Sequence, residues 1–178
     1  DSNFIDIAFS VGGKEVIIGT TRPELLPACV AVFFHPDDKR YTKYAGKKAK
    51  VPIFGHEVPI IADKRAEMEK GTGIVMCCTF GDQTDMDWQK AHNLPIISAI
   101  GPNGHMTNEA KHYKDLYVKK ARKEIIEELR QKGLLKNEKK IKHAVNVHER
   151  CKTEIEYIKS KQWFISYLDL RSDMLKWG

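Results

Sequence analysis

Short apolar segments of strand length, separated by residues typical of turns, occupy most of this 178-residue sequence. Gly12 and Gly13 join the first two segments and favour a two-residue hairpin turn. Pro52 and Pro59 cannot donate to a central ladder of hydrogen bonds, so segment 51–61 is expected at an edge or a bend. The predicted strands are 4–11, 14–19, 28–34, 51–61, 74–78, 96–100, 141–147, 155–158 and 163–167. This many short strands favour a mainly β architecture.

Helical patterns are fewer than strand patterns. Asp63 can cap a short helix over 63–71, and Thr84 can cap a second helix over 84–93. The longest helix is predicted near residues 116–133, where apolar residues fall on one stripe. These residues are Val118, Ala121, Ile125 and Leu129. We therefore predict one domain of the α+β class, mainly β, in which a closed or partly closed β-barrel is decorated by a few helices.

The composition limits the class of protein. No apolar run is long enough for a membrane-spanning helix. The first three residues, Asp1, Ser2 and Asn3, lack the basic and apolar regions of a signal peptide. We therefore expect a cytoplasmic protein without a membrane partner.

The cysteines and histidines do not predict a metal site. Cys29, Cys77, Cys78 and Cys151 lack the spacing of structural zinc ligands, and reduced thiols fit a cytosolic protein. His148 with Cys151 resembles half of a zinc knuckle, but without a second pair an ordinary loop is favoured. The histidines form no H-E-x-x-H pair.

The formal net charge of +6 is concentrated between residues 111 and 142, where basic residues outnumber acidic ones. Lys119, Lys120, Arg122, Lys123 and the basic run 136–142 belong to this stripe. Such a stripe fits the phosphate backbone of a nucleic acid, and it equally fits the solvated face of a helix.

The segment from Thr20 to Arg22 is the first candidate for chemistry. It follows a predicted strand and precedes Pro23, which favours the first turn of a helix. Two hydroxyls, backbone N–H groups and a guanidinium at a helix start suit an anion or a terminal nucleotide. The alternative is a threonine N-cap, with Glu24 placed for the helix dipole and Arg22 exposed.

A second candidate is the acidic segment 81–85. If Thr84 caps the helix, Asp85 lies in its first turn and Asp82 lies in the loop before it. A fixed carboxylate at this position can receive the α-ammonium of an amino acid. Capping and solubility are the alternative roles. Segment 71–73, Gly-Thr-Gly, permits close backbone approach but is not a Walker motif, so ATP binding in this chain is unsupported.

Several segments follow one another in the order found in one enzyme family. They are 20–24, 28–34, 58–63, 71–73, 92–95 and 162–165. In this order they resemble the inserted editing domain, called CP1, of valyl-tRNA synthetases, which are class I aminoacyl-tRNA synthetases. Arg22 after two threonines favours the valyl over the isoleucyl enzyme, and segment 78–82 resembles the archaeal branch.

The resemblance implies a proofreading reaction. In valyl enzymes themselves, a hydrophobic pocket is known to reject threonine only about 10²-fold against valine, so a second site must hydrolyse threonyl-tRNA(Val). The resemblance assigns the α-ammonium to Asp85 and the terminal adenosine or ester to Thr20, Thr21 and Arg22. It gives Asp82 as a candidate general base, so that Asp82, Thr20 and Thr21 form the candidate catalytic set.

The resemblance also implies a substrate pocket and partners. The pocket would include Lys70, Met76, Cys78 and Thr79, although many family members have lysine and threonine where this chain has Met76 and Cys78. Water would be the nucleophile without a cofactor in this domain, while ATP and magnesium would belong to the missing synthetase core. The partners would be the acceptor end of tRNA(Val) carrying threonine and the rest of the synthetase.

Residues 1–168 would form the editing domain, expected to be a monomer in isolation, and 169–178 would begin the connection back to the core. Two alternatives remain open at this stage. One is an isoleucyl-tRNA synthetase editing domain that clears valyl-tRNA(Ile). The other is a non-catalytic RNA-binding barrel that uses the basic stripe alone.

Overall fold

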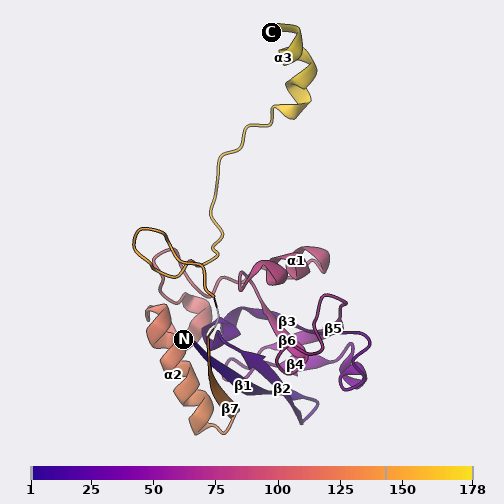
Figure 1. Ribbon diagram of the computed structural model, residues 1–178, viewed down its shortest axis with the longest axis vertical. Coiled ribbons are helices and arrows are strands. Elements are labelled where there is room, and N and C mark those ends of the chain that lie inside the picture. The colour runs from indigo at the N-terminus through magenta and orange to yellow at the C-terminus, as the bar shows by residue number, and fades with distance from the viewer. Residues whose placement is uncertain (1, 143, 178) are drawn as a thin grey trace.

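The computed structural model describes residues 2–142 and 144–177 and contains a seven-stranded mixed sheet (Figure 1). The strands run in the order β2-β1-β4-β5-β3-β6, with β7 paired to β1. Their bounds are β1 Ser2–Val11, β2 Lys14–Thr20, β3 Cys29–Phe34, β4 Lys48–Lys50, β5 Glu57–Ala62, β6 Ile74–Cys78 and β7 Leu135–Ile141. The two end strands of this order, β2 and β6, contact each other, so the sheet curls into a nearly closed barrel. This confirms the predicted fold class.

The β1–β2 hairpin forms where the two glycines predict it. Val11 pairs with Lys14, and Gly12 and Gly13 adopt φ angles of 55° and 79°. Positive φ at both central residues is characteristic of the type I′ turn, whose twist matches that of the strands.

The proline-containing segment differs in part from its prediction. Pro52 lies in a turn, as expected, but Pro59 lies inside β5, which pairs with β4 on one side and β3 on the other. The pairing with β3 begins only at Ile60, so the ladder starts one residue beyond the missing N–H. β5 is therefore an interior strand, and the edge prediction is wrong for Pro59.

In the described part of the chain, three α-helices and four short 3₁₀ helices accompany the sheet. They are α1 Gln83–Ala91, α2 Val118–Gln131, α3 Arg171–Trp177, η1 Pro23–Ala28, η2 Thr42–Tyr44, η3 Asn108–Tyr113 and η4 Leu168–Leu170. α2 buries the four residues of the predicted apolar stripe and packs against η1. None of the helices in residues 2–142 and 144–177 has the length and apolar composition of a membrane span.

The core has two parts. The larger one fills the barrel and includes Ile7, Phe9 and Leu26. The smaller one lies between the sheet and α1, where the rings of Phe33 and Trp88 stack with centroids 4.4 Å apart and planes 12° apart. This second core fixes α1 against β3 and β6, and the start of α1 is therefore held rigidly beside the strand ends.

Several local predictions are wrong. Residues 63–71, all described, form turns instead of a helix, because the Asp63 carboxylate accepts a hydrogen bond from the Arg65 backbone N–H at 2.8 Å and closes a local turn. Residues 96–100 form no strand beyond one bridge between Ile100 and Met106.

The C-terminal region contains none of the predicted strands over 155–158 and 163–167, which are fully described. The predicted strand 141–147 includes residue 143, which lies outside the described residues; β7 ends at residue 141. Residues 144–158, here called the arm, loop back beside the body, and the chain beyond runs away from it to α3 (Figure 1). Trp163 is 101% exposed, so these apolar residues lack the burial that stabilises a strand.

Candidate functional site

A cavity of about 440 Å³ brings the two candidate segments together. Its walls come from the end of β2, segment 65–73, β6 and the start of α1. The predicted site residues that line it are Thr20, Thr21, Arg22, Lys70, Met76, Cys78, Asp82 and Asp85. Segments about sixty residues apart in the sequence therefore share one enclosed space.

Thr79 is the predicted site residue that the fold places outside the cavity lining. Its side chain is buried, and its hydroxyl donates to the Pro95 carbonyl at 3.3 Å and accepts from the Ile97 N–H at 3.1 Å. These contacts anchor the irregular segment after α1. The Thr79 hydroxyl is therefore engaged by the backbone of that segment and supports the scaffold.

The two threonines after β2 differ in their hydrogen bonds. The Thr20 hydroxyl accepts the Arg22 backbone N–H at 3.0 Å, which closes a tight turn before Pro23. Within the described residues, the Thr21 hydroxyl has no hydrogen-bond partner, and both side chains are half-buried at the cavity wall. The Thr21 hydroxyl is thus available to a ligand.

Arg22 belongs to an ion-pair cluster of two arginines and two glutamates. Its Nε donates to Glu24 Oε1 at 3.0 Å, and its Nη2 donates to Glu156 Oε2 of the arm at 2.5 Å. Glu24 is 0% exposed, and Arg122 of α2 binds both of its oxygens at 2.8 Å. Arg122 therefore neutralises a buried carboxylate, and it is not a free member of the basic stripe.

The start of α1 corrects the predicted cap. The helix begins at Gln83, and the cap is Asp82, whose Oδ1 accepts the backbone N–H of Asp85 at 2.9 Å. Asp82 has the extended backbone of an N-cap, with φ −153° and ψ −171°, while Thr84 already lies within the first turn. The position of Asp85 is therefore set by a hydrogen bond from its own backbone to Asp82.

Asp85 is the most unusual group of the cavity. It is 8% exposed, and no ion pair among the described residues includes it. Burial, and secondly the charge of Asp82, raise the pKa of Asp85 to about 7. A buried carboxylate without a cationic partner suits a ligand that brings a positive charge.

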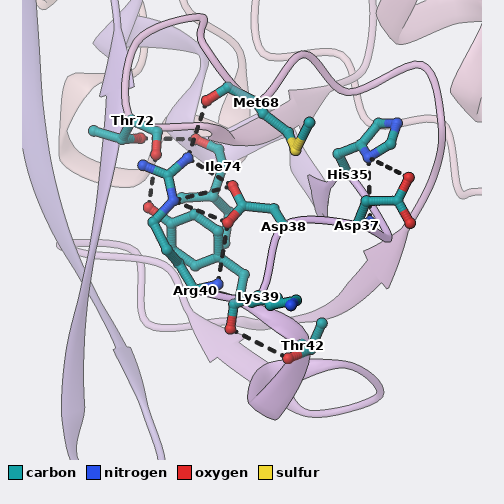
Figure 2. A network of polar contacts seen from close by, with 10 residues as sticks. His35, Asp37, Asp38, Lys39, Arg40, Thr42, Met68, Thr72 and Ile74 are labelled. Carbon is teal, nitrogen blue, oxygen red and sulfur yellow. Dashed lines mark hydrogen bonds and ion pairs between the residues drawn. The ribbon is translucent and has the colours of Figure 1, made fainter.

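A clamp formed by Asp38, Arg40 and Tyr41 contacts the chain at Met68 and, through the Tyr41 hydroxyl, at the Thr72 carbonyl beside the cavity (Figure 2). Arg40 donates to both oxygens of the buried Asp38, and its Nη2 also donates to the Met68 carbonyl at 3.0 Å. These hydrogen bonds hold the pKa of Asp38 below its usual range. A Cβ at Gly73 would lie 2.4 Å from Arg40 Nη2 and 2.6 Å from the Met68 oxygen, so only glycine fits there.

Sequence reasoning missed this clamp. The residue types at 35–38, His-Pro-Asp-Asp, are typical of a turn and indicate nothing more specific. The available signal was an acidic residue two positions before an arginine, which permits the bidentate pair between Asp38 and Arg40. That signal does not identify Met68 and Gly73 as the third and fourth partners, since they are distant in the sequence.

The remaining wall of the cavity is largely apolar. Met76 and Cys78 are 7% and 1% exposed, and Phe4, Leu25 and Trp88 also line the space. Burial raises the pKa of Cys78, which keeps its thiol protonated. Lys70 lies at the exposed rim, 3.6 Å from Glu67.

The histidine and cysteine pair of the arm stands apart from this cavity. His148 Nδ1 lies 3.3 Å from Cys151 Sγ, and both side chains are exposed. The residues described contain no group of three side chains arranged to hold a metal ion. The pair therefore remains a local contact within a turn.

Comparison with known proteins identifies relatives that are all aminoacyl-tRNA synthetases or parts of them. A family model described as "Leucyl-tRNA synthetase, editing domain" matches residues 35–148. Valine–tRNA ligases are similar to nearly the whole chain: that of Thermoplasma acidophilum is 51% identical over 177 residues, covering 99% of this chain and 22% of the ligase. That of Haloarcula marismortui is also 51% identical, over 161 residues, covering 90% of this chain and 18% of the ligase. The chain thus spans about a fifth of these relatives.

A solved structure supports the fold. The LeuRS–tRNA–LeuAMS ternary complex of Agrobacterium radiobacter K84 agnB2 matches with a TM-score of 0.61 and 16% identity, covering 78% of this chain and 20% of that one. The Pyrococcus horikoshii valine–tRNA ligase adds 48% identity over 97% of this chain and 20% of the ligase. Family match, sequence similarity and fold agree, and this chain belongs to the family of aminoacyl-tRNA synthetase editing domains.

Proposed function

We propose that the cavity hydrolyses the aminoacyl ester of threonyl-tRNA(Val), as the editing site of a valyl-tRNA synthetase. The observation that carries this proposal is Asp85, a buried carboxylate without a cationic partner among the described residues, in the same cavity as Thr20, Thr21 and Arg22. The similarity to valine–tRNA ligases supports the choice of tRNA. Since the relatives described above are valine–tRNA ligases, the valyl interpretation is preferred to the isoleucyl alternative.

The cavity residues fit the parts of such a substrate. The Asp85 carboxylate would bind the α-ammonium, and this ion pair would fix the amino acid relative to the wall of β6. The hydroxyls of Thr20 and Thr21 would contact the ester or the terminal adenosine, and the guanidinium of Arg22 would contact the terminal nucleotide. Held in this way, the ester carbonyl needs only a positioned water.

The reaction balances without a cofactor from this domain. The water oxygen attacks the carbonyl carbon, the bond from that carbon to the ribose oxygen breaks, and the ribose oxygen takes a proton. The products are free threonine and uncharged tRNA. Asp82 is the candidate that removes a proton from water, because its cap hydrogen bond occupies only Oδ1 and its side chain lines the cavity.

Discrimination against valine would depend on hydrogen bonds to the threonine hydroxyl. Met76 and Cys78 give the wall of β6 little capacity for such bonds. The hydroxyl would therefore bond to the polar side chains of the same cavity, and valine would leave those groups desolvated and unpaired.

The basic stripe would supply only part of the contact with tRNA. Lys119, Lys120 and Lys132 form ion pairs with Glu154, Glu124 and Glu128. Arg122 is occupied by Glu24. The exposed residues Lys123, Lys139 and Lys140 remain the candidates for phosphate contacts. The synthetase core, with its ATP and magnesium, is the second proposed partner, and the cytoplasm is the proposed location.

The test is deacylation of threonyl-tRNA(Val) by this chain and by Asp85→Asn. The substitution keeps the shape of the side chain and removes its charge, so we expect kcat/KM to fall by about 10²-fold or more, as for loss of a charge-assisted hydrogen bond and its positioning. Asp87→Asn is the matched control, because Asp87 is exposed on the same helix.

Three results would count against the proposal. Equal rates for wild type and Asp85→Asn would remove the assigned role of Asp85. Faster hydrolysis of valyl-tRNA(Ile) than of threonyl-tRNA(Val) would favour the isoleucyl alternative. Tight tRNA binding without any deacylation would favour a non-catalytic RNA-binding barrel.

A further inference from the structure

The cluster around Arg22 contains two carboxylates with very different surroundings. Glu24 lies in η1 and is 0% exposed, and Arg122 binds it through two hydrogen bonds at 2.8 Å. Removing that carboxylate would leave the partly buried Arg122 without the partner of both its hydrogen bonds, so Glu24 is a permanent partner. Glu156 binds only through one hydrogen bond, from Arg22 Nη2 at 2.5 Å.

The arm that carries Glu156 is loosely attached. Ile155, Tyr157 and Ile158 are 50%, 39% and 44% exposed. The arm is tied to the body by the pair of Glu156 with Arg22 and by the pair of Glu154 with Lys119 at 3.7 Å. A second cavity of about 320 Å³ lies between the arm and segment 101–104. Unfilled space beneath an exposed segment lowers the cost of moving it.

The charges of the cluster balance only while Glu156 is in place. Two arginines face two glutamates, so loss of Glu156 leaves one net positive charge on Arg22 at the edge of the first cavity. A phosphodiester carries one negative charge and accepts hydrogen bonds from a guanidinium in the same way as a carboxylate. It would therefore restore the balance.

We propose that Arg22 is a phosphodiester subsite at the edge of the cavity, and that the Glu156 carboxylate fills this subsite until the 3′ end of an RNA displaces it. The inference rests on the proposed function for the identity of the RNA. It adds an exchange of anions on Arg22: Glu156 leaves, the phosphodiester takes its place, and Glu24 stays. RNA binding and displacement of the arm are then one event.

The test measures binding of a short single-stranded RNA that ends in CCA and carries no amino acid. Binding to the full chain is followed by fluorescence anisotropy. Glu156→Gln weakens the internal competitor without changing its shape, and we expect binding to tighten about tenfold, the size of one charge-assisted hydrogen bond. Glu154→Gln is the matched control, because it removes the other ion pair of the arm without touching Arg22. It should bind RNA within about twofold of wild type.

Two further measurements show whether the effect depends on Arg22 and on phosphate. The double variant Arg22→Gln with Glu156→Gln should bind no more tightly than Arg22→Gln alone, and thermal melting checks that both remain folded. Adenosine, which has no phosphate, should bind wild type and Glu156→Gln equally. A gain for adenosine as well would mean that the substitution merely opens the cavity, and it would overturn the proposal.

RNA binding that is unchanged or weaker in Glu156→Gln would also overturn it, as would an equal gain in Glu154→Gln. Because the RNA carries no aminoacyl ester, none of these outcomes depends on ester hydrolysis. Failure of the editing reaction and failure of the anion exchange are therefore observed separately.

Discussion

At the scale of single residues, Asp85 combines burial with an unneutralised charge. Carboxylates are seldom buried without a partner, because desolvation disfavours the charged form. Asp85 is 8% exposed, and the charge that most affects its pKa belongs to another acid, Asp82. The folded state therefore holds Asp85 in an environment that a cationic ligand would relieve.

This environment has a consequence for stability. The folded pKa of Asp85 is about 7, above the usual value of 3.8, so the carboxyl destabilises the fold increasingly as pH rises from about 4 to about 7. Asp85→Asn should be more stable than wild type at pH 8, by on the order of 4 kcal/mol, and equally stable below pH 4. Urea unfolding at the two pH values measures the difference. A pH-independent difference would contradict the raised pKa.

Activity should require the ionised form of Asp85, which is the form that destabilises the fold. Binding of an ammonium requires ionised Asp85, so kcat/KM for deacylation should decline as pH falls below about 7. Asp82→Asn keeps an N-cap and removes the neighbouring charge, so the acid limb should move to lower pH. A pH–rate profile of both proteins tests this. An acid limb that stays in place would contradict the influence of Asp82 on the pKa of Asp85, and a lower plateau rate would support Asp82 as the proposed general base.

The sequence predicted much of the site at this scale, and the reasons for its failures are local. Eight of the nine predicted site residues line the cavity, because the family pattern identifies segments that the fold brings together even though they are distant in the sequence. Thr79 lies outside the lining because its hydroxyl bonds to the backbone of Pro95 and Ile97, and no local sequence pattern predicts these two contacts. Glu24, Arg122 and Glu156 could not be joined, since they are far apart in the chain.

At the scale of elements, segment 63–73 shows how tertiary contacts override local propensity. Asp63 was expected to cap a helix, yet its carboxylate binds Arg65 and, at 2.7 Å, His92 after α1. The segment is thereby tied to α1 at one end and to the Asp38–Arg40 clamp at the other. The amphipathic helix α2 was predicted correctly, because its periodic stripe extends over several turns.

The clamp makes Gly73 a sensitive position. Gly73→Ala adds a Cβ within 2.6 Å of the Met68 oxygen and also strains a φ of 79°, so we expect a loss of at least about 2 kcal/mol in unfolding free energy. Gly12→Ala is the control, because its φ is also positive but nothing lies within 4 Å, and it should lose only about 1 kcal/mol. Equal losses would show that the clamp leaves room for a side chain.

At the scale of the whole molecule, the barrel and the C-terminal region behave differently. Apolar segments that alternate with turn residues predicted the barrel, and each of its strands except β7 buries side chains in a shared core. Segments 155–158 and 163–167 have similar composition but no sheet to join, since Trp163, Phe164 and Ile165 are 101%, 89% and 86% exposed. Composition alone does not distinguish the two cases.

A chain that ends at residue 160 tests this separation. The residues removed are exposed, so the melting temperature should stay within about 2 °C of that of the full chain. Loss of exposed apolar surface should also reduce aggregation, measured by light scattering. A large fall in melting temperature would show that the C-terminal region packs against the body in solution.

The contact between β2 and β6 gives the barrel one further property. These strands approach each other without joining the hydrogen-bonded order, in which β2 pairs with β1 and β6 with β3 among the residues described. Both candidate segments flank this seam, since Thr20 ends β2 and segment 79–85 follows β6. A complete ring of strands would consume its own backbone donors and acceptors. Among the described residues, β2 and β6 share no such hydrogen-bonded pairing, and residues of both strands line the cavity, so the cavity lies at the gap where the ring of strands does not close.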